Sequence, residues 1–530
     1  MRLVFMGELV YPTSSMTLDQ SNIVLIHPPA ALCCQPAPAP ALLAGRLRAA
    51  GAKVEVVDAN AEALHVLLNG VDERHATDTA QRRALGQRER SLAQLTSPAA
   101  YRNRDRHHNA VSALRQVLRL AAGPTSDHIP DLAQYTHLVR SPMRSGDLLA
   151  AAADFQDSPY GPYFHDLARR LALAPPGVIG LSVGYLHQAL PAMALAGTLR
   201  RALPDTRVIM GGALLGCWQG RLAPDGLAPW VDRVVFGDGA VPLLEEAGLP
   251  CPAPDLLERA EPDFSDTPFD LYLAPGRVVP MATSEGCFWS RCSYCPEAVA
   301  NAPFGLLHGE ALPRVLERLW RRTGASLLHL SDSAVPPASL ELLAAQRWPL
   351  AWYGFARFHP ALAQEETARG LHRSGCRLLQ LGLESGSPAV LRRLNKGIDL
   401  KLASRVLKAL GAAGVPTYLY VMFGVPGETE ADAQLTLDFV ADHAGHITFL
   451  NTSLLNLPLA SPPEPGLRRV PFPQEKDLTL YSDFLDDSGH DRRAARKFLE
   501  RRFARHPDVA AILRRTPLVF GANHAPFMSL

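Results

Sequence analysis

Residues 283–295 of the chain read TSEGCFWSRCSYC, and three of the chain's eight cysteines lie in this stretch. Cys287, Cys292 and Cys295 follow the spacing C-x4-C-x2-C, and Trp289 and Tyr294 are among the aromatic residues between them. A structural zinc site usually takes four ligands in two separated pairs, and no fourth cysteine or histidine lies close by. Three thiolates on one loop are suited to hold three irons of a 4Fe–4S cluster and to leave the fourth iron open. A zinc knuckle or three incidental buried cysteines are the alternatives.

The composition is that of a large globular chain without a dominant charge. The chain has 530 residues, 47% of them hydrophobic, and its 53 basic and 52 acidic side chains leave a net charge of +1. This length predicts two to four domains, and the small net charge offers no field for nucleic acid or an anionic membrane. No apolar run reaches the length of a membrane span, residues 1–16 lack the order of a signal peptide, and eight cysteines form no disulfide framework. We therefore expect a soluble cytoplasmic protein with no nucleic-acid partner and no membrane span.

Short β-branched runs alternate with helical stretches through the first half of the chain. The expected strands are residues 22–27, 53–58, 178–183, 207–210 and 231–236, and the expected helices include 39–50 and 187–203. Strands that alternate with helices of this length indicate a parallel sheet covered on both faces. We therefore predict an α/β fold that begins with a flexible segment, residues 1–20. Its N-terminal domain, residues 21–250, is expected to be a doubly wound, flavodoxin-like sheet.

Ligands of a doubly wound sheet bind at the carboxyl ends of its strands. Small and polar residues follow the expected strands there, and glycine lets the backbone approach a large flat ligand. The candidate pocket residues are Pro28, Ser182, Gly184, Gly211, Gly212, Gly237 and Asp238. His27 and His187 also lie near this edge, and each is interpreted as a rim or core histidine.

Two segments depart from the alternating pattern. Residues 70–170 are rich in Arg, Gln, Asp and His, and a structureless loop of that length is improbable inside a compact domain, so a helical insert is predicted. The insert is either a substrate lid or a solvated decoration, and the second interpretation is favoured. Residues 251–275 contain several prolines and acidic residues, which is typical of a domain linker.

Strand and helix patterns alternate again from residue 276 to 465. The expected strands are residues 281–284, 327–330, 352–357, 378–386, 417–424 and 447–451, of which the first leads into the cysteine loop. Six βα units predict a partial (β/α)6 barrel, and barrels of this kind place their chemistry at the carboxyl ends of the strands. Residues 466–530 are expected to form a small helical C-terminal region. Its basic segment, residues 491–503, is interpreted as a docked amphipathic helix rather than a nucleic-acid arm.

The cysteine loop resembles that of the radical S-adenosylmethionine (SAM) enzymes, whose usual spacing is C-x3-C-x2-C. The extra residue between Cys287 and Cys292 resembles members of the family that carry a cobalamin-binding domain in front. The first half of the chain is similar to that domain in the segments GVIGLSV, RVIMGGA and VVFGDG, which begin at residues 177, 207 and 234. The resemblance implies bound cobalamin. Because the D-x-H-x-x-G motif is absent, it also implies cobalt without a histidine ligand from the protein; a folded but empty domain is the alternative.

The same resemblance assigns roles in the barrel. It implies that Cys287, Cys292 and Cys295 bind the 4Fe–4S cluster and are the catalytic centre. Arg357 is expected to bind the SAM carboxylate, which a guanidinium can grip with two hydrogen bonds. The other expected SAM contacts are Ser331, Asp332 and Ser333 for the amino group, Gly382, Glu384 and Ser385 for the methionine or ribose portion, and Gly424 near adenine.

In this family a reduced cluster gives one electron to SAM, and a 5′-deoxyadenosyl radical then removes hydrogen from an unactivated carbon. The resemblance therefore implies an enzyme that uses a 4Fe–4S cluster, SAM and cobalamin to methylate an unactivated carbon of a small-molecule or natural-product substrate. A one-electron donor such as flavodoxin or ferredoxin is the implied partner. One alternative keeps both cofactors but catalyses a rearrangement, cyclisation or oxidation. Another is a non-catalytic corrinoid or iron–sulfur sensor or electron carrier.

Overall fold

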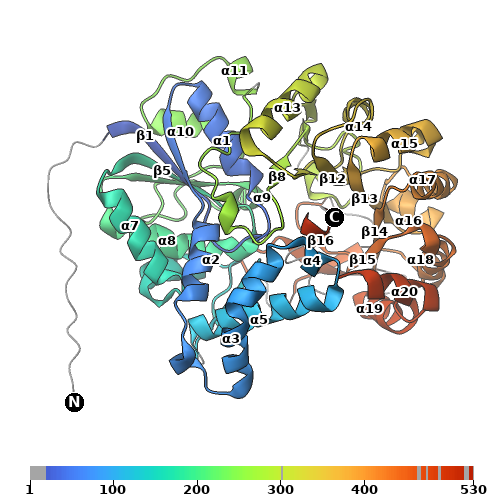
Figure 1. Cartoon of the computed structure of the whole chain (residues 1–530), viewed down its shortest axis with the longest axis horizontal. Coiled ribbons are helices and arrows are strands. Elements are labelled where there is room, and N and C mark those ends of the chain that lie inside the picture. Colours follow the sequence, from blue (N-terminus) through green and yellow to red (C-terminus); the bar gives the residue numbers. More distant parts are fainter. Residues whose placement is uncertain are drawn as a thin grey trace.

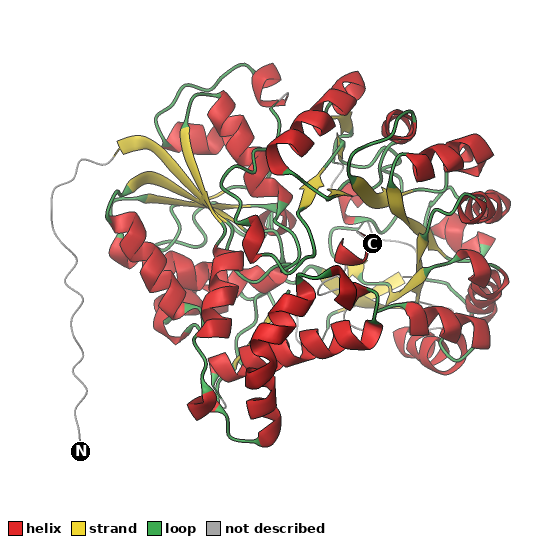
Figure 2. Ribbon diagram, viewed as in Figure 1, coloured by secondary structure: helices red, strands yellow, loops and turns green. Residues whose placement is uncertain are grey.

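The structure, a computed structural model, describes residues 19–123, 125–258, 260–299, 302–461, 467–472, 476–486, 491–517 and 525–528. Its two main sheets form two lobes, with the first sheet on the left of Figure 1 and the second on the right. Helices α3 (Thr79–Leu95) and α5 (Arg104–Ala122) project at the bottom of the view (Figure 2). The predicted flexible segment, residues 1–20, lies almost wholly outside the described residues.

The first sheet has five parallel strands, and helices cover both of its faces. The strand order is β2 (Lys53–Val57), β1 (Asp19–Ile26), β5 (Pro176–Ser182), β6 (Arg207–Gly211), β7 (Arg233–Val234). The main helices beside it are α1 (Pro38–Ala49), α2 (Ala59–Asn69), α8 (Ala189–Ala202) and α10 (Ala240–Glu246). Val24 and Ile26 face one buried core and Ile23 and Leu25 the other, because successive side chains of a strand point to opposite faces. The predicted doubly wound sheet is confirmed.

The last strand of this sheet is shorter than predicted. The sequence indicates residues 231–236, whereas β7 comprises Arg233–Val234 alone. The Val235 amide still donates to the Met210 carbonyl of β6 at 2.8 Å, and the chain then turns at Gly237, whose φ is 109°. A short helix, α9 (Ala213–Cys217), follows β6 at the same edge.

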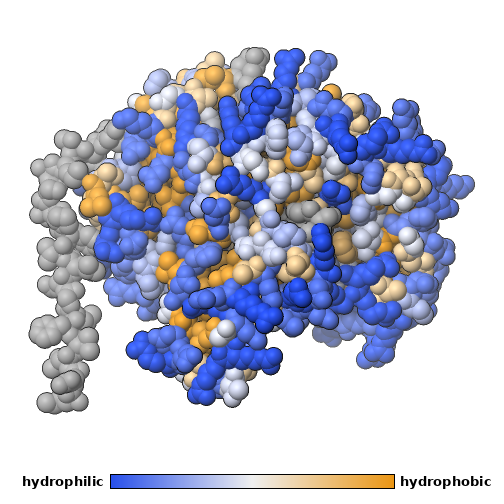
Figure 3. Space-filling model, viewed as in Figure 1, coloured by the Kyte–Doolittle hydropathy of each residue, from blue (hydrophilic) through white to orange (hydrophobic). Residues whose placement is uncertain are grey.

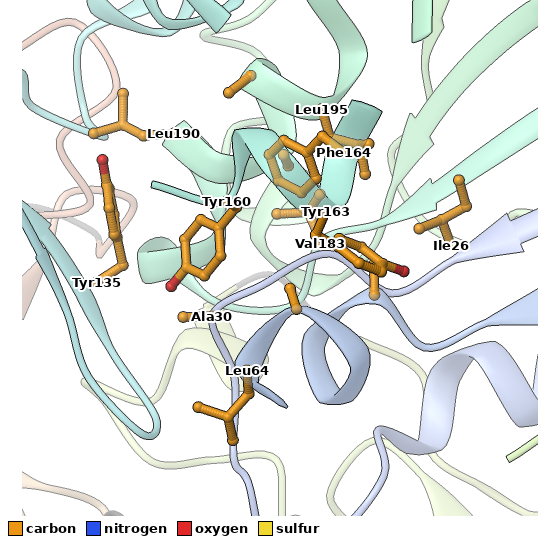
Figure 4. Packing of buried hydrophobic residues seen from close by; sticks show 14 of the residues in the cluster. Ile26, Ala30, Leu64, Tyr135, Tyr160, Tyr163, Phe164, Val183, Leu190 and Leu195 are labelled. Atoms are coloured by element: carbon orange, nitrogen blue, oxygen red, sulfur yellow. The ribbon is translucent and has the colours of Figure 1, made fainter. Parts of the chain in front are cut away.

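The insert between β2 and β5 is largely helical, as predicted. Besides α3 and α5 it contains α4 (Pro98–Tyr101), α6 (Ser145–Ala153), α7 (Gly161–Ala172) and an antiparallel hairpin of β3 (His128–Pro130) and β4 (Tyr135–His137). Tyr160, Tyr163 and Phe164 are at most 3% exposed, and they pack among side chains of the sheet and of α8 (Figure 4). The insert therefore shares a core with the first sheet, which a solvated decoration would not do.

The segment between the two sheets is docked against the first lobe. It contains α11 (Pro254–Glu258) and the 3-10 turn η4 (Phe269–Leu271). The Tyr272 hydroxyl donates a hydrogen bond to the Asp58 carboxylate, and the Leu273 amide donates to the Cys33 carbonyl at 2.8 Å. The domain limits at residues 250 and 276 stay predictions.

The second sheet has six parallel strands whose order follows the chain. That order is β15 (Phe449–Leu454), β14 (Thr417–Phe423), β13 (Cys376–Glu384), β12 (Ala351–Ala356), β11 (Leu327–Leu330), β8 (Val278–Met281). The helices on its outer face are α13 (Leu312–Thr323), α14 (Pro337–Ala344), α15 (Glu365–Arg373), α17 (Leu400–Ala412) and α18 (Glu430–Asp442). Shorter helices, α12 (Pro296–Val299) and α16 (Pro388–Arg393), lie in the connections. The predicted partial (β/α)6 barrel is confirmed.

The first barrel strand ends earlier than predicted. The sequence indicates residues 281–284, but β8 ends at Met281, and Ser284–Glu285 form β9, which pairs with β10 (Gly305–Leu306) in an antiparallel bridge. The Thr283 amide donates to the carboxylate of Asp332 at 3.0 Å rather than to a neighbouring strand. The chain therefore leaves the sheet before it reaches the cysteine loop.

In the described part of the C-terminal region, the helices follow a small antiparallel sheet. Strands β17 (Leu467–Val470) and β18 (Tyr481–Asp486) join β16 (Leu457–Pro458) in a small antiparallel sheet that the sequence does not predict. Helix α19 (Arg492–Phe498), the π-helical turn η8 (Leu499–Phe503) and α20 (Pro507–Arg515) follow. Phe498 and Phe503 contact Phe423 of β14, with ring centroids 5.9 and 4.9 Å apart. The basic segment is therefore a docked helix, as expected.

Two segments from outside the barrel fill the end at which its strands begin. Cys34, in the loop after β1, and Met528, in the turn η9 (Ala525–Met528), pack with Tyr353 of β12 in one buried cluster. The side-chain amide nitrogen of Gln35 lies 2.9 Å from Nδ1 of His329 in β11. The first lobe therefore supplies part of the floor of the barrel.

The face of the molecule in Figure 3 is mostly hydrophilic. Large exposed apolar side chains, such as Val139 at 74% and Leu173 at 75%, occur on the surface. None of the helices that the structure describes has the combination of length and apolar character that crossing a membrane requires.

Candidate active site

A cavity of about 460 Å³ lies at the carboxyl ends of the barrel strands. All three cysteines of the loop, Cys287, Cys292 and Cys295, line it. Five barrel strands, or the turns that follow them, contribute further residues, and others come from connecting segments and from β18. These residues include Ser333, Phe355, Arg357, Gly382, Glu384, Tyr420, Met422 and Ser453, with Glu297, Lys396 and Tyr481. The cavity therefore brings the cysteines together with four of the predicted SAM residues, namely Ser333, Arg357, Gly382 and Glu384.

Asp332 anchors the start of the cysteine loop. Its side chain is 3% exposed and accepts hydrogen bonds from the amide and hydroxyl of Thr283 and from the hydroxyl of Ser284, at 2.7 to 3.0 Å. Burial raises the pKa of Asp332, and these hydrogen bonds oppose the rise. The carboxylate therefore fixes the backbone immediately before Cys287.

The middle of the loop is held by the segment after α16. The indole nitrogen of Trp289 donates to the Asn395 carbonyl at 2.9 Å, and the Ser293 amide donates to the Leu394 carbonyl at 3.0 Å. Gly397 has a φ of 66°, and a Cβ there would lie 2.1 Å from the indole ring. A glycine is therefore required at 397 for the ring to pack in this position.

Two cations lie beside Cys292. Arg357 is 9% exposed, its Nη1 lies 3.9 Å from the Cys292 sulfur, and its other terminal nitrogen donates to the Lys396 carbonyl. Burial raises the pKa of the Cys292 thiol, whereas the positive charges of Lys396 and Arg357 oppose this rise. The site thus supplies positive charge next to a sulfur that must be a thiolate to bind metal.

An ion pair completes this part of the wall. Nζ of Lys396 lies 2.8 Å from Oε1 of Glu384, and the two side chains are 14% and 22% exposed. Glu384 has a φ of 69°, which is rare for a residue other than glycine and turns the chain at the end of β13. The hydroxyl of Ser333 donates to the Glu297 carboxylate on the same wall.

The donor set suits an iron–sulfur cluster better than a single metal ion. In the part of the chain that the structure describes, no three His, Cys, Asp or Glu side chains converge on one metal position. The three cysteines nevertheless line one cavity. Thiolates spread around a cavity fit a cluster, in which each thiolate binds a different iron.

Four of the predicted SAM residues do not line the cavity: Ser331, Asp332, Ser385 and Gly424. Ser385 is fully buried, and its hydroxyl lies 3.0 Å from that of Thr436 in α18. The Gly424 amide donates to Oε2 of Glu428 at 2.5 Å. The Ser385 hydroxyl and the Gly424 amide therefore stabilise the turns after β13 and β14. The assignment of all four residues as SAM contacts stays a prediction.

Several cavity residues were not indicated by the sequence motifs. Tyr420 and Met422 alternate along β14 and so face the barrel interior, a signal that the period of a strand contains. Lys396 and Glu297 carry no such signal, because each reaches the wall from a connecting segment.

A second cavity, of about 260 Å³, lies at the carboxyl ends of the first sheet's strands. Five of the seven predicted pocket residues line it, namely Ser182, Gly211, Gly212, Gly237 and Asp238. Most of the remaining wall is apolar, from Leu25, Leu42, Leu43, Leu181, Ile209, Val235 and Leu243. Gly212 has a φ of 116°, and a Cβ there would lie 2.4 Å from the Val183 carbonyl oxygen. An open, largely apolar cavity at this edge fits part of a large ligand such as cobalamin.

Pro28 and Gly184 do not line this second cavity. The fully buried Gln188 binds both, because its amide nitrogen donates to the Pro28 carbonyl at 2.6 Å and its oxygen accepts from the Gly184 amide at 2.9 Å. His27 is 4% exposed, and burial lowers its pKa. None of the described residues that line the cavity is a histidine.

Arg46 of α1 links the second cavity to the chain that leads into the cysteine loop. It lines the second cavity, and its guanidinium forms 3.0 Å ion pairs with Asp238 on that wall and with Glu285 in β9. The Arg46 side chain is 9% exposed, whereas those of Asp238 and Glu285 are 52% and 56% exposed. One buried cation thus joins the first lobe to the chain two residues before Cys287.

Residues 281–440 match the radical SAM superfamily. Among individual proteins, the ribosomal protein uS12 methylthiotransferase RimO of Pelotomaculum thermopropionicum is 27% identical over 48% of this chain and 63% of its own length. The tRNA-2-methylthio-N(6)-dimethylallyladenosine synthase of Mycobacterium bovis is 31% identical over 47% of this chain and 53% of its own length. The chain therefore spans less than two thirds of the curated relatives it matches.

Two solved structures of one enzyme share the fold over nearly the whole chain. The radical SAM methyltransferase TsrM from Kitasatospora setae, with cobalamin and a 4Fe–4S cluster bound, aligns with a TM-score of 0.50 over 85% of this chain and 80% of that one, at 17% identity. The same enzyme with tryptophan and a SAM analogue aligns with a TM-score of 0.53 over 96% and 92%, at 16% identity. At this identity the likeness concerns the fold.

Proposed function

We propose that the chain, whose residues 281–440 match the radical SAM superfamily, is a cobalamin-dependent enzyme that transfers a methyl group to an unactivated carbon of a small molecule. The observation that carries the proposal is the cavity wall that Cys287, Cys292 and Cys295 share with Arg357 and Glu384. A 4Fe–4S cluster bound there supplies the electron that cleaves SAM, and cobalamin supplies a methyl carrier.

The proposal gives roles to the cysteines, the charged residues and three apolar or aromatic residues of the cavity wall. The three thiolates hold the cluster, and Arg357 binds the SAM carboxylate with its guanidinium. The Lys396–Glu384 pair orients Glu384 toward the rest of SAM. Phe355, Tyr420 and Met422 line the inner part of the cavity and exclude water from the reacting atoms. The protein contributes position and a dry site rather than acid–base chemistry.

The cavity of the first sheet is the proposed place for cobalamin. Its glycines allow close backbone approach, and its aliphatic wall suits an apolar part of the ligand. Cobalt would have no histidine ligand from this cavity wall. The TsrM fold, in a protein solved with both cofactors, supports this arrangement of the two lobes.

The test is anaerobic reconstitution with iron and sulfide. The wild type is expected to bind a 4Fe–4S cluster and to form 5′-deoxyadenosine or S-adenosylhomocysteine from SAM, and cobalamin should be required for S-adenosylhomocysteine. The variant Cys287→Ala/Cys292→Ala/Cys295→Ala should lose nearly all cluster iron and all SAM cleavage. Cys251→Ala, which changes an exposed cysteine in the segment between the two sheets, is the matched control. Full iron content and SAM cleavage in the triple variant would contradict the proposal.

A second candidate function is methylthiolation of a macromolecule, which the sequence identity to RimO and the tRNA-modifying synthase favours. A non-methylating radical reaction and a non-catalytic sensor are further alternatives. Mass spectrometry of products separates them. A methyl gain that depends on cobalamin supports the main proposal, a methylthio gain supports the second candidate, and a sensor would form no 5′-deoxyadenosine or S-adenosylhomocysteine.

A further inference from the structure

The indole of Trp289 lies between the active-site wall and the protein surface. Trp289 does not itself line the cavity, but Arg357 does, and the guanidinium carbon of Arg357 lies 4.7 Å from the indole centroid. The guanidinium carbon of Arg291 lies 5.4 Å from the same ring. Arg357 is 9% exposed, whereas Arg291 is exposed. The ring therefore contacts a buried cation, Arg357, that lines the cavity and an exposed cation, Arg291, at the protein surface.

The packing leaves this ring little freedom. Its nitrogen is bound to the Asn395 carbonyl, and Gly397 makes room for its edge. Arg357 packs on the Trp289 ring and also lies near the cysteine loop's second cysteine, because its Nη1 is 3.9 Å from the sulfur of Cys292. Indole, guanidinium and thiol thus form a continuous packed path from the surface to a proposed cluster ligand.

The surface around Trp289 is basic. Arg291, Arg392 and Arg393 are exposed, and the loop that contains Arg291 contacts the 393–395 segment through Ser293 and Trp289. Among the residues that the structure describes, neither Arg291 nor Arg392 forms an ion pair. The acids nearest in sequence are engaged elsewhere. Glu285 pairs with Arg46, Glu297 accepts a hydrogen bond from Ser333, and Asp399 caps α17.

Apolar side chains border the same loop. Phe304, immediately before β10, is 43% exposed, and Leu306, in β10, is 46% exposed. The centroid of the Phe304 ring lies 6.3 Å from that of Phe288.

A small contact area with charged residues is typical of the weak, short-lived complexes through which electron carriers react. Complementary charge raises the rate at which such complexes form.

We propose that the surface formed by Trp289, Arg291, Arg392 and Arg393 binds a small acidic electron-carrier protein, and that the electron enters the protein at Trp289. The inference rests on the proposed function, because it requires the cluster. One electron leaves the reduced flavin or iron–sulfur group of the carrier and reduces the oxidised cluster, so that the carrier is oxidised by one electron. No covalent bond is formed or broken in this step.

The test compares two charge reversals in the reconstituted protein. Arg291→Glu/Arg392→Glu changes the proposed surface, and Arg82→Glu/Arg119→Glu changes two exposed arginines on α3 and α5 as the matched control. Iron content is measured first. Cluster bleaching is then followed by stopped flow after mixing with a reduced bacterial flavodoxin or with dithionite, and binding of oxidised flavodoxin is measured by calorimetry.

The surface variant is expected to lose about tenfold or more in the second-order rate with flavodoxin at low salt and to bind oxidised flavodoxin more weakly. The rate at which dithionite reduces the cluster of the surface variant should equal that of the wild type. The control variant Arg82→Glu/Arg119→Glu should match the wild type in both reduction rates and in flavodoxin binding. The wild-type flavodoxin rate should fall as salt is added. A surface variant as fast as the wild type, or a wild-type rate indifferent to salt, overturns the inference. A wild type without cluster iron would instead overturn the proposed function.

Trp289→Leu tests the path separately from the docking surface. Because it removes no charge, it should bind oxidised flavodoxin less weakly than Arg291→Glu/Arg392→Glu does, and at saturating flavodoxin it should accept an electron several-fold more slowly per cluster than the wild type. An unchanged electron-transfer rate would show that the electron does not enter at Trp289.

Discussion

Glu428 is the buried acid of the turn after β14. It is fully buried, and its Oε2 accepts hydrogen bonds from the amides of Gly424 and Val425 at 2.5 and 3.3 Å. Its other oxygen has no hydrogen-bond partner in the described part of the chain. Burial raises the pKa of Glu428 to about 7, although the two amides oppose the rise. The carboxyl group therefore binds its proton more tightly in the folded protein than in the unfolded chain.

This raised pKa predicts that stability falls as pH rises. The contribution of Glu428 is fully present below the unfolded-state pKa of about 4.5 and is lost as pH rises through about 7, a loss on the order of 3 kcal/mol. Glu428→Gln keeps an acceptor for the Gly424 amide but cannot ionise, so its free energy of unfolding should lose this part of the pH dependence. Urea unfolding at about pH 5 and about pH 8 measures the difference. Glu430→Gln, at an exposed position, is the control; parallel curves for wild type and Glu428→Gln would contradict the prediction.

Single residues were predictable where the signal is local. The resemblance to the radical SAM enzymes, carried by the cysteine spacing and by residues at strand ends, indicated Cys287, Cys292, Cys295, Arg357 and Glu384. These residues do line one cavity, and their roles as ligands stay predictions. Lys396 and Arg46 were not indicated, because Lys396 lies in a connecting segment and the partners of Arg46 are distant in sequence. Arg46 reaches Glu285 across 239 positions of sequence, and no local pattern encodes such a pair.

The docked C-terminal helix is an element that the barrel needs for its outer core. Phe503 is fully buried against Phe423. Phe503→Ala should lower the free energy of unfolding by about 3–5 kcal/mol, because truncating a buried phenylalanine leaves a cavity. Chemical denaturation measures the loss. Arg501→Ala removes an exposed side chain from the same turn and should change stability little. Equal stability of the two variants would show that the helix is not anchored by its aromatic face.

Elements were predicted best where hydrophobic periodicity is strong. Both parallel sheets were found in this way, whereas the helical insert was inferred from the length of a segment too long for a structureless loop. The end of β8 was misplaced because the Asp332 side chain, 49 positions away from Thr283, takes the amide that a longer strand would use. β17 and β18 were missed because each is short and is stabilised by pairing with the other and with β16, which propensity does not reveal.

For the whole molecule, the contact between the lobes could not be predicted from sequence. The Arg46 ion pairs now predict a coupling between them. Arg46→Gln should raise hydrogen–deuterium exchange several-fold in residues 284–289 and 237–240, because the two acidic side chains are half exposed and become hydrated separately. Exchange in β11 should stay unchanged.

Arg48→Gln is the matched control for this prediction. It lies on the same helix and also pairs with two carboxylates, those of Asp263 and Asp266, but it does not contact the cysteine loop. If both variants change exchange in residues 284–289 equally, the effect belongs to α1 in general and the specific role of Arg46 is wrong.

The loop after β1 has a consequence for exchanging the two halves between related proteins. Cys34 and Gln35 belong to the first half of the chain, yet they pack inside the barrel against Tyr353 and His329. A chimera joined within residues 251–275 would replace residues 32–35, so that side chains from a related protein would pack against the native barrel strands. A hybrid that works should therefore keep residues 32–35 matched to the barrel they support, even when the rest of the first half is replaced.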